Sequence, residues 1–359
     1  MRLAIDAHTL EIEQWAGKEY YLFSLLQALS RQTEPEIFIY CRKDLPSLKS
    51  IFGRRFHFVA KNLKTPLWQI WLLNSLRKNR IDHFLAPCAY LAAAFNVLIP
   101  QTVVIHDLTA FLPSVRRTHT WPLRLKEKLT LFLALKNSRN IIAVSESTKN
   151  DLIKVFPSQQ KKVNLIYQGS RFEILKKNDV IREKSPLILS VGTIEPRKNI
   201  PAIVTAFENL KRLKPDIAWR LVIIGKIGWK AASILEMIKK SPFSGEIEIA
   251  GYVDDQYLKK YYQQALCLVY PSFYEGFGLP PLEAMSNGCP VIVAGNSSLP
   301  ETVGKAGIFF NQNKTIEEII LELERNKLWR EEHIYKGLEQ AKNFSWNKAA
   351  QTILRLIQE

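Results

Sequence analysis

The sequence predicts an α/β protein made of two doubly wound, Rossmann-like domains, each built on a parallel sheet. Its 359 residues are enough for two domains of about 150 residues each. In both halves, short all-apolar segments alternate with segments of helical length, which is typical of parallel strands covered by helices on both faces. A polar run over residues 172–185 separates the two series. We therefore expect domains over residues 1–178 and 185–343, followed by a helix over residues 344–359.

The first half contains six expected strands and four long expected helices. Each strand is a short run rich in aliphatic or aromatic residues, and each helix carries apolar residues at helical spacing. The strands cover 3–5, 37–41, 84–86, 102–106, 140–144 and 164–166, and the helices cover 19–30, 68–78, 123–136 and 146–156.

The second half follows the same pattern. Its expected strands cover 187–191, 221–224, 246–250, 266–270, 291–294 and 307–310, with helices such as 201–211 and 256–264 between them. Residues 345–358 form an amphipathic segment, because Ala349, Ile353 and Ile357 recur at helical spacing.

Composition indicates a globular protein of a reducing compartment. The hydrophobic share of 47% and the charged share of 23% are those of soluble domains. No apolar run approaches the roughly 18 to 20 residues that span a bilayer, and no secretory signal is visible at the start. The four cysteines have neither metal-like nor paired spacing. We therefore expect a cytoplasmic protein.

The net charge of +16 is concentrated in the first half. Residues 1–180 carry 27 Lys and Arg against 14 Asp and Glu, whereas residues 181–359 carry 23 against 20. Three kinds of partner would explain such a basic half: nucleic acid, an anionic membrane face or a polyanionic substrate.

The most informative segment is the loop and helix start over residues 270–285. The apolar run 266–270 indicates a buried strand, and two consecutive prolines at 280 and 281 suit the first turn of the helix that follows. A strand, a glycine-containing loop and a helix start together present backbone N–H groups to an anion. Here those groups belong to Gly276, Phe277, Gly278 and Leu279.

Two carboxylates flank this anion site. Glu275 lies in the loop and Glu283 lies about one turn into the helix. A carboxylate beside a phosphate is suited to accepting hydrogen bonds from hydroxyls, so the pair indicates a sugar nucleotide as ligand. The alternative for Glu283 is that it only complements the helix dipole.

The following residues complete a longer pattern. After the helix come Ser286-Asn-Gly-Cys-Pro290, the strand 291–294 and Gly295-Asn-Ser-Ser-Leu-Pro-Glu301. In order and spacing, residues 270–310 resemble the retaining glycosyltransferases of family four, which have the GT-B fold. The resemblance implies two Rossmann-like domains with the active site in the inter-domain cleft, and a final helix that crosses back to the first domain. It also implies transfer with retention, in which the leaving phosphate takes the proton of the acceptor.

A second loop, Gly192-Thr-Ile-Glu-Pro-Arg-Lys-Asn199, follows the strand 187–191. Arg197 and Lys198 therefore lie at the carboxyl end of a strand, where open α/β sheets bind ligands, and both cations suit a diphosphate. A solvated surface is the alternative. The family usually has an arginine where this chain has Thr193, which leaves open whether Arg197 takes its place. The Glu-Pro-Arg-Lys-Asn form is most similar to bacterial mannosyltransferases and implies GDP-mannose as the donor.

Further candidates come from other strand ends. His106 ends the strand 102–106, where it can contact a sugar hydroxyl or assist proton transfer, or simply cap the strand. The resemblance implies that it contacts the donor sugar. It also implies that Gly17 lies near the donor phosphate and that Gly225, Lys226 and Val253 lie near the nucleobase, for which a plain turn is the alternative. The remaining five histidines have no comparable setting.

Two segments of the first half are both basic and apolar. Residues 67–80 contain Trp68 and Trp71 followed by cations, and Arg116 and Arg117 precede a similar segment over 121–132. Ordinary core helices with solvated outer faces are the alternative. Together with the charge asymmetry, these segments lead to the hypothesis of peripheral docking on an anionic membrane face.

The sequence as a whole predicts a hexosyltransferase of cell-envelope polysaccharide (lipopolysaccharide) biosynthesis. It would move mannose from GDP-mannose to a glycan or polyprenyl-linked acceptor, with His106, Lys198 and Glu275 as catalytic groups and Glu283 on the ribose diol. No metal or other cofactor is expected, because no Asp-x-Asp occurs, and no nucleic-acid-binding motif is present. The alternatives are a UDP-sugar donor, or a non-catalytic sugar-nucleotide-binding or scaffold protein.

Overall fold

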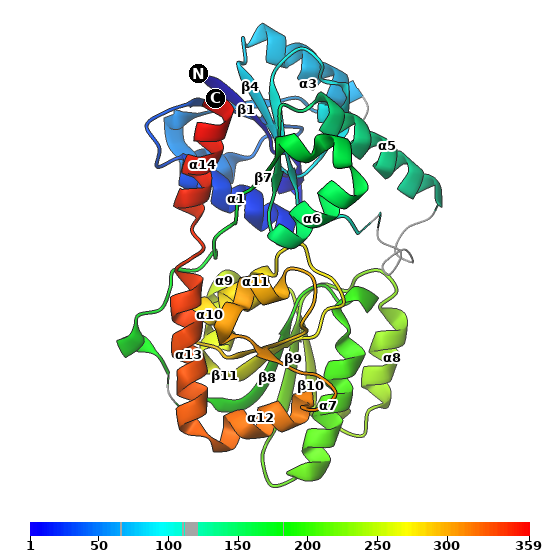
Figure 1. Cartoon of the computed structure of the whole chain (residues 1–359), viewed down its shortest axis with the longest axis vertical. Coiled ribbons are helices and arrows are strands. Elements are labelled where there is room, and N and C mark those ends of the chain that lie inside the picture. The colour runs from blue at the N-terminus through cyan, green and yellow to red at the C-terminus, as the bar shows by residue number, and fades with distance from the viewer. Residues whose placement is uncertain (65–66, 110, 112–120, 182) are drawn as a thin grey trace. The chain divides into compact units, whose positions relative to one another are not determined.

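The computed structural model describes residues 1–64, 67–109, 111, 121–181 and 183–359. The chain divides into two compact units, whose elements are labelled in Figure 1. Unit 1 comprises Met1–Gly169 together with Ser345–Glu359, and unit 2 comprises Ser170–Phe344. The last helix is therefore grouped with the first domain.

Residues 170–178 belong to unit 2, although the sequence led us to assign them to the first domain. Their contacts explain this placement. The Arg171 guanidinium pairs with Asp255 at 2.9 Å, and the Leu175 backbone N–H donates to the carbonyl of Ser286 at 2.8 Å. The chain thus joins unit 2 before the polar run ends.

Unit 1 is built on a seven-stranded sheet in the order β3-β2-β1-β4-β5-β6-β7. All neighbouring strands are parallel. The strands are β1 (Arg2–Asp6), β2 (Glu36–Cys41), β3 (Phe56–Ala60), β4 (His83–Ala86), β5 (Gln101–Ile105), β6 (Asn140–Ala143) and β7 (Val163–Leu165). Because β2 and β4 lie on opposite sides of β1, the strand order reverses between β1 and β4.

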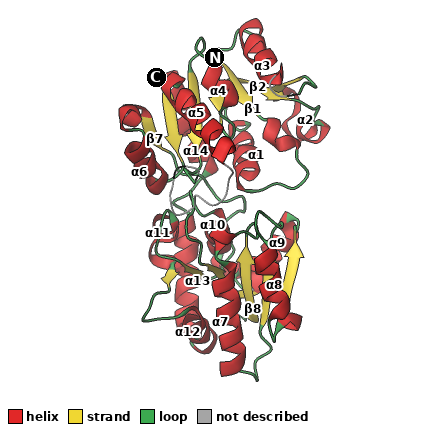
Figure 2. Ribbon diagram, turned by 90° about the vertical axis from the view of Figure 1, so that its right-hand side faces the viewer, coloured by secondary structure: helices red, strands yellow, loops and turns green. Residues whose placement is uncertain are grey.

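Helices cover the sheet of unit 1 (Figure 2). They are α1 (Gly17–Leu29), α2 (Pro46–Phe52), α3 (Leu67–Lys78), α4 (Leu91–Phe95), α5 (Trp121–Asn137), α6 (Glu146–Val155) and α14 (Trp346–Gln358). The C-terminal helix α14 packs on α1, and the two lie side by side in Figure 1. Its buried face includes Ala350, Ile353 and Ile357, and the Trp346 ring meets that of Tyr21 edge-on at 5.1 Å.

Unit 2 is built on a six-stranded parallel sheet in the order β10-β9-β8-β11-β12-β13. The strands are β8 (Ser185–Val191), β9 (Arg220–Ile224), β10 (Ile247–Gly251), β11 (Ala265–Tyr270), β12 (Val291–Val293) and β13 (Ile308–Phe309). The helices are α7 (Ile200–Leu213), α8 (Ala232–Lys240), α9 (Asp255–Gln264), α10 (Leu279–Ser286), α11 (Leu299–Val303), α12 (Ile316–Arg325) and α13 (Lys327–Ala341).

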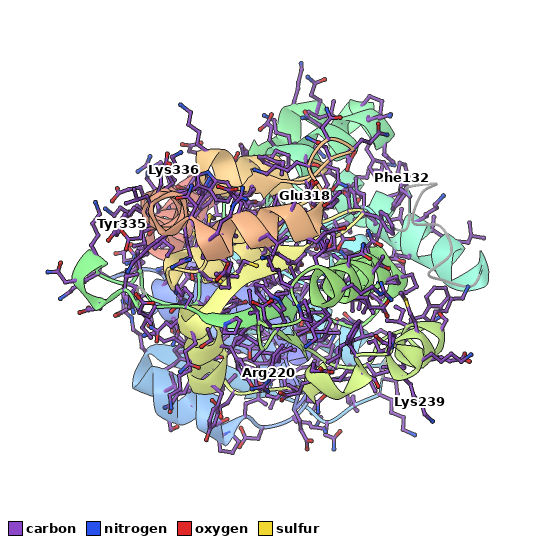
Figure 3. All side chains as sticks on the ribbon, turned by 90° about the horizontal axis from the view of Figure 1, so that it is seen from below. Phe132, Arg220, Lys239, Glu318, Tyr335 and Lys336 are labelled. Carbon is purple, nitrogen blue, oxygen red and sulfur yellow. The ribbon has the colours of Figure 1, made fainter. Side chains whose placement is uncertain are left out.

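The amphipathic helices of unit 2 bury one face and expose the other. In α12, Ile316, Ile319 and Leu323 are buried, whereas Glu318 is exposed and is labelled in Figure 3 with other outward-facing side chains such as Lys239. This division follows from apolar residues spaced three or four apart.

All twelve expected strands are present, and their observed ends lie within two residues of the predicted ends. The prediction missed β3 (Phe56–Ala60), in which Phe56 alone is buried. This strand lies at the edge of the sheet, and His57 interrupts its apolar residues. The continuous apolar run that indicates a central parallel strand is therefore absent.

Candidate active site

The candidate site of unit 2 lies where the strand order reverses. Strands β8 and β11 are neighbours, but β9 follows β8 on one side and β12 follows β11 on the other. In open α/β sheets, ligands bind at the carboxyl ends of the two strands that flank such a reversal. The loops that follow β8 and β11 are the two that the sequence singled out.

A compact ion cluster joins these two loops. Lys198 Nζ donates to Glu275 Oε1 at 2.6 Å and to the Tyr270 hydroxyl at 2.7 Å. Arg197 Nη1 donates to Glu275 Oε2 at 2.9 Å, and the same guanidinium pairs with Glu195 at 2.7 Å. Three of the sequence-predicted site residues are therefore brought together around one carboxylate.

The cluster holds Glu275 in its ionised form. Burial alone would raise the pKa of Glu275, but the charges of Lys198 and Arg197 outweigh burial and lower the pKa to about 2. Burial also lowers the pKa of Lys198, while the contact with Glu275 opposes this change. The site thus contains a buried ion pair whose members depend on each other for their charges.

Backbone and side-chain hydrogen bonds fix the two loops against one another. The Phe273 backbone N–H donates to the carbonyl of Arg197 at 2.9 Å, and Asn199 Nδ2 donates to the carbonyl of Pro271 at 3.3 Å. Asn199 adopts a left-handed conformation (φ +52°, ψ +40°) at the start of α7, which asparagine tolerates better than most residues.

The sequence analysis missed residues after β12 that brace the Glu275 loop. Ser297 Oγ accepts from the Glu275 backbone N–H at 3.0 Å, and Ser298 Oγ donates to the Glu275 carbonyl at 3.0 Å. Thr302 Oγ1 donates to the Phe277 carbonyl at 2.6 Å. Ser297 and Ser298 stand inside the 295–301 pattern and Thr302 directly follows it, but hydroxyls near a helix start are equally consistent with simple capping.

The segment Gly276–Leu279 leads directly into α10. Gly278 precedes the first residue of the helix and has φ +104°, a conformation that strongly favours glycine. A Cβ at this position would lie 3.0 Å from Leu299. The prolines occupy the first turn of α10, as predicted, because that turn has no intrahelical N–H bond to lose.

Glu283 is placed differently from Glu275. It lies in α10, is 2% exposed, and pairs with Arg171 Nε at 2.7 Å. The Tyr262 hydroxyl donates to Glu283 Oε2 at 3.1 Å. Burial raises the pKa of Glu283 against the opposing effect of Arg171. The structure thus gives Glu283 an ion-pair partner, Arg171, that the sequence did not indicate.

The candidate nucleobase residues follow β9 and β10. Gly225 has φ +146°, and a Cβ there would lie 2.1 Å from the carbonyl oxygen of Gly192. The Lys226 carbonyl accepts from the Ile194 N–H at 2.9 Å, whereas Val253 lies half-buried between β10 and α9. Gly225 is therefore needed for the close approach of the loop that carries Lys198.

His106 and Gly17 lie in unit 1. His106 follows β5, is buried, and bonds through Nε2 to the carbonyl of Pro87 at 2.7 Å. Burial and the charge of Lys18 lower its pKa to about 4. Since a carbonyl only accepts, Nε2 carries the hydrogen in the neutral ring, and Nδ1 is left as an acceptor. Gly17 is the first residue of α1, and a Cβ there would meet no atom within 4 Å.

Comparison with known proteins identifies the family. The family described as "Glycosyl transferases group 1" matches residues 171–340, and "Glycosyltransferase Family 4" matches residues 15–171. The O-antigen chain mannosyltransferase B of Escherichia coli is 34% identical over 307 residues, which cover 82% of this chain and 78% of that protein. The chain belongs to the group 1, family 4 glycosyltransferases. It is an enzyme of the hexosyltransferase class.

Solved structures show the same fold. Sucrose-phosphate synthase from Thermosynechococcus elongatus superposes on the glycosyltransferase with a TM-score of 0.79 at 17% identity, covering 99% of this chain and 98% of that one. Anabaena HepE in complex with UDP and glucose gives a TM-score of 0.75 at 15% identity, covering 100% of this chain and 99% of that one. The glycosyltransferase thus has the GT-B architecture of two Rossmann-like domains, as the sequence predicted.

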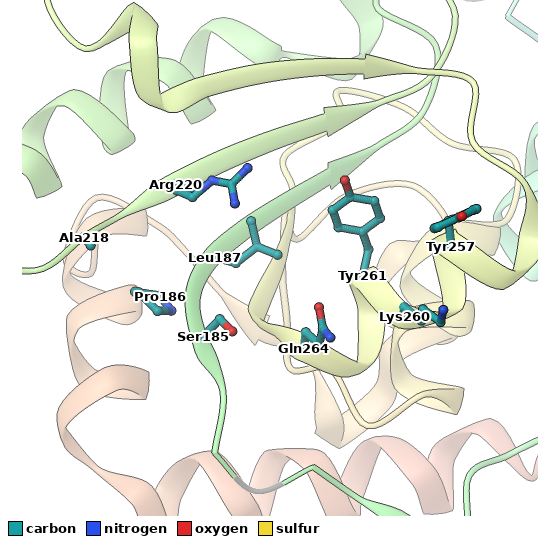
Figure 4. Close-up of a pocket in the computed structure, with 9 residues that line it drawn as sticks. All are labelled: Ser185, Pro186, Leu187, Ala218, Arg220, Tyr257, Lys260, Tyr261 and Gln264. Atoms are coloured by element: carbon teal, nitrogen blue, oxygen red, sulfur yellow. The ribbon is translucent and has the colours of Figure 1, made fainter.

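A separate cavity of about 540 Å³ lies at the opposite edge of the unit 2 sheet. It is formed at the amino-terminal ends of β8 and β9 and along α9, with the Tyr261 ring and Arg220 projecting into it (Figure 4). Its lining residues are Ser185, Pro186, Leu187, Ala218, Arg220, Tyr257, Lys260, Tyr261 and Gln264. Because ligands of such sheets bind at the carboxyl edge, we do not assign the donor to this cavity.

Neither a metal site nor a membrane-spanning helix is found among the residues that the structure describes. Among the residues that the structure describes, no group of three or more His, Cys, Asp and Glu is arranged to hold a metal ion. None of the helices in the described ranges combines the length and the apolar character needed to cross a bilayer.

Proposed function

We propose that the glycosyltransferase transfers mannose from GDP-mannose, with retention of configuration, to a glycan or polyprenyl-linked saccharide acceptor of cell-envelope polysaccharide biosynthesis. The observation that carries the choice of sugar is the 34% identity to an O-antigen chain mannosyltransferase over most of both chains. The site residues of unit 2 support a nucleotide sugar as the donor.

The donor diphosphate would lie against the segment Gly276–Leu279 and the start of α10. Backbone N–H groups and the positive end of the helix dipole favour an anion there. An ammonium group has three hydrogen-bond donors, and Lys198 directs two of them to Glu275 and Tyr270. The third would reach a phosphate oxygen.

Glu275 would orient the donor sugar. An ionised carboxylate offers about four lone-pair sites, and Lys198 and Arg197 each occupy one. The remaining sites suit the hydroxyls of a hexose. Arg197 would act mainly by holding this carboxylate, because its guanidinium bonds to Glu195, Glu275 and the Tyr274 carbonyl.

The proposed transfer exchanges one bond at C1 of the donor sugar for another. The bond between C1 of the sugar and the diphosphate oxygen breaks, a bond from C1 to the acceptor oxygen forms on the same face, and the acceptor proton passes to the departing phosphate. Negative charge therefore grows on the phosphate, where Lys198 and the α10 amides would stabilise it. His106, through its unprotonated Nδ1, would accept a hydrogen bond from a donor-sugar hydroxyl.

The test is thermal unfolding of the purified protein with GDP, UDP, ADP and CMP. A ligand at about 100 times its dissociation constant adds about 2.7 kcal/mol of stability. We expect GDP alone to raise the unfolding temperature, and GDP-mannose to be consumed in the presence of envelope glycan. Stabilisation by UDP alone would overturn mannose as the sugar, and no stabilisation by any nucleotide would overturn donor binding.

We also propose that unit 1 docks on an anionic membrane face. Large apolar side chains are exposed on α3, at the end of α4 and just after it, and on α5, and α4 packs against both other helices. The exposed apolar side chains are those of Leu67, Ile70, Phe95, Val97, Leu98, Leu125, Leu129 and Phe132. Trp68, by contrast, is buried and donates to the carbonyl of Cys41, and Arg116 and Arg117 lie outside the described residues.

A further inference from the structure

We propose that the cavity of about 540 Å³ in unit 2 is a second ligand site, which binds a saccharide that carries a phosphate or a carboxylate group. This site is distinct from the proposed donor site and does not depend on the identity of the donor. The cavity lies at the amino-terminal ends of β8 and β9, whereas the donor site lies at the carboxyl edge of the sheet. Its volume is within the range of about 300–1,000 Å³ that is typical of small-molecule sites.

One face of α9 forms a wall of the cavity. The lining residues of this helix are Tyr257, Lys260, Tyr261 and Gln264. Their spacing of three, four and seven positions places them on one side of the helix. Leu258 and Tyr262 are buried, and α9 packs on β8 and β11. The cavity face is therefore separate from the buried face, and its two tyrosines are not needed to fill the core.

The cavity is cationic. Among the described residues, its lining contains Arg220 and Lys260 and no Asp or Glu. Arg220 Nη2 donates to Glu248 at 2.8 Å, and no other bond is found for this guanidinium in the described ranges, so most of its five N–H groups are available. Lys260 Nζ lies 5.4 Å from the centre of the Tyr257 ring. Two cations favour an anion, and the guanidinium fork matches the paired oxygens of a phosphate or a carboxylate.

The neutral groups of the lining suit the rest of a sugar. Ser185 and Tyr261 carry hydroxyls and Gln264 carries an amide, and no hydrogen bond of these three side chains is found in the part of the chain that the structure describes. Such groups both donate and accept, as sugar hydroxyls do. The Tyr261 ring points into the cavity beside Leu187 (Figure 4). An aromatic and aliphatic wall with a few polar groups suits a pyranose, which has C–H faces and a rim of hydroxyls.

The cavity as a whole selects both parts of the ligand. A neutral sugar would leave the two cations without an anion, and inorganic phosphate would leave the tyrosines and the apolar wall without a partner. A phosphorylated sugar and a sugar acid share the required chemistry, an anionic group attached to a sugar ring.

The first test is titration calorimetry of the full-length protein, with and without GDP. The probes are mannose 6-phosphate, glucuronate, methyl α-mannoside and inorganic phosphate. We expect mannose 6-phosphate or glucuronate to bind at least tenfold more tightly than methyl α-mannoside and inorganic phosphate, and equally well with GDP present. The tighter of the two identifies the anionic group. The proposal is overturned if neither binds more tightly than both simpler probes, or if GDP displaces them.

The second test locates the bound ligand. Arg220→Gln and Lys260→Gln should each weaken binding about ten- to a hundredfold, because each removes a hydrogen bond between charged groups. Ala218 lines the cavity and is exposed, so that Ala218→Trp should fill the space and abolish binding without removing a charge.

Two matched variants control for the loss of a cation. Arg212→Gln and Lys259→Gln remove cations of unit 2 that do not line the cavity, and both should leave binding unchanged. Thermal unfolding shows whether each variant is folded, and the stabilisation by GDP should persist in all of them. Unchanged binding in Arg220→Gln and Ala218→Trp, or equal losses in the cavity variants and the controls, would overturn the site. Absence of stabilisation by GDP in the wild type would instead contradict the proposed function.

Discussion

Glu275 and Glu283 are both buried carboxylates of the unit 2 site, yet their partners differ. Glu275 has two cations, Lys198 and Arg197, and its pKa falls to about 2. Glu283 has one guanidinium, that of Arg171, and burial outweighs it, so that its pKa rises. The two residues should therefore contribute to different parts of the reaction.

This difference gives a prediction for Lys198 and Glu283. Lys198→Ala should lower kcat by a factor of about 10² to 10³, because the interaction strengthens as charge develops on the phosphate. Glu283→Gln should mainly raise the donor KM, by about ten- to a hundredfold, because a hydrogen bond to a charged group contributes about 1.5–3 kcal/mol. Initial rates over a titration of GDP-mannose measure both quantities.

A matched lysine variant and the choice of glutamine at position 283 control for the loss of a charge and for a loss of stability. Lys239→Ala removes an exposed lysine of α8 and should change neither constant. Glutamine is used at 283 because its amide oxygen can still accept a hydrogen bond from Arg171, whose side chain is 12% exposed, whereas alanine would remove this acceptor entirely. If Glu283→Gln lowers the unfolding temperature but leaves the donor KM unchanged, Glu283 is purely structural.

At the scale of elements, the site depends on how closely the loops after β8 and β9 approach each other. The Gly192 N–H donates to the Ile224 carbonyl at 2.8 Å and the Gly225 N–H donates to the Gly251 carbonyl at 2.7 Å. These bonds continue the pairing of the strands beyond their ends. They hold the β8 loop, and with it Lys198, at the carboxyl edge of the sheet.

Gly225→Ala should disturb this arrangement. Gly225 has a φ of +146°, and a Cβ there would lie only 2.1 Å from the Gly192 carbonyl oxygen. The substitution would therefore force the backbone of the β8 loop to move, at a cost of about 1–3 kcal/mol. We expect a lower unfolding temperature together with weaker stabilisation by GDP, both measured by thermal unfolding. Gly245→Ala, where a Cβ meets no atom within 4 Å, should leave both unchanged, and equal behaviour of the two variants would contradict the argument.

At the scale of the whole molecule, the excess positive charge lies in the half of the sequence that forms most of unit 1. Exposed apolar side chains on α3 and α5 belong to the same unit. The free energies of apolar contact and of attraction to anionic lipid add together, and each cation near the membrane surface contributes about 1 kcal/mol to binding. This combination favours a membrane surface over a soluble polyanion.

Vesicle sedimentation tests the membrane proposal. The protein should sediment with phosphatidylglycerol vesicles more than with phosphatidylcholine vesicles, and less at high salt, because salt screens the attraction. The double change of Leu67 and Ile70 to serine should weaken binding. Leu328→Ser is the matched control, because Leu328 is 81% exposed but lies in unit 2. Equal sedimentation with both lipids would contradict the proposal.

The sequence by itself determined most of the secondary structure. Central strands such as β5 and β11 are short apolar runs, which only a sheet covered on both faces can bury. The loops after β8 and β11 were identified because polar and glycine residues directly follow such runs. These are local signals, and they require no knowledge of which residues meet in space.

Only the tertiary structure decided which side chains are partners. Lys198 and Glu275 are 77 residues apart in the chain, and Arg171 and Glu283 are 112 apart. The pairing of Lys198 with Glu275 depends on the strand order, which brings the ends of β8 and β11 together. Burial then makes each pairing energetically important, because a charge removed from water requires a compensating partner.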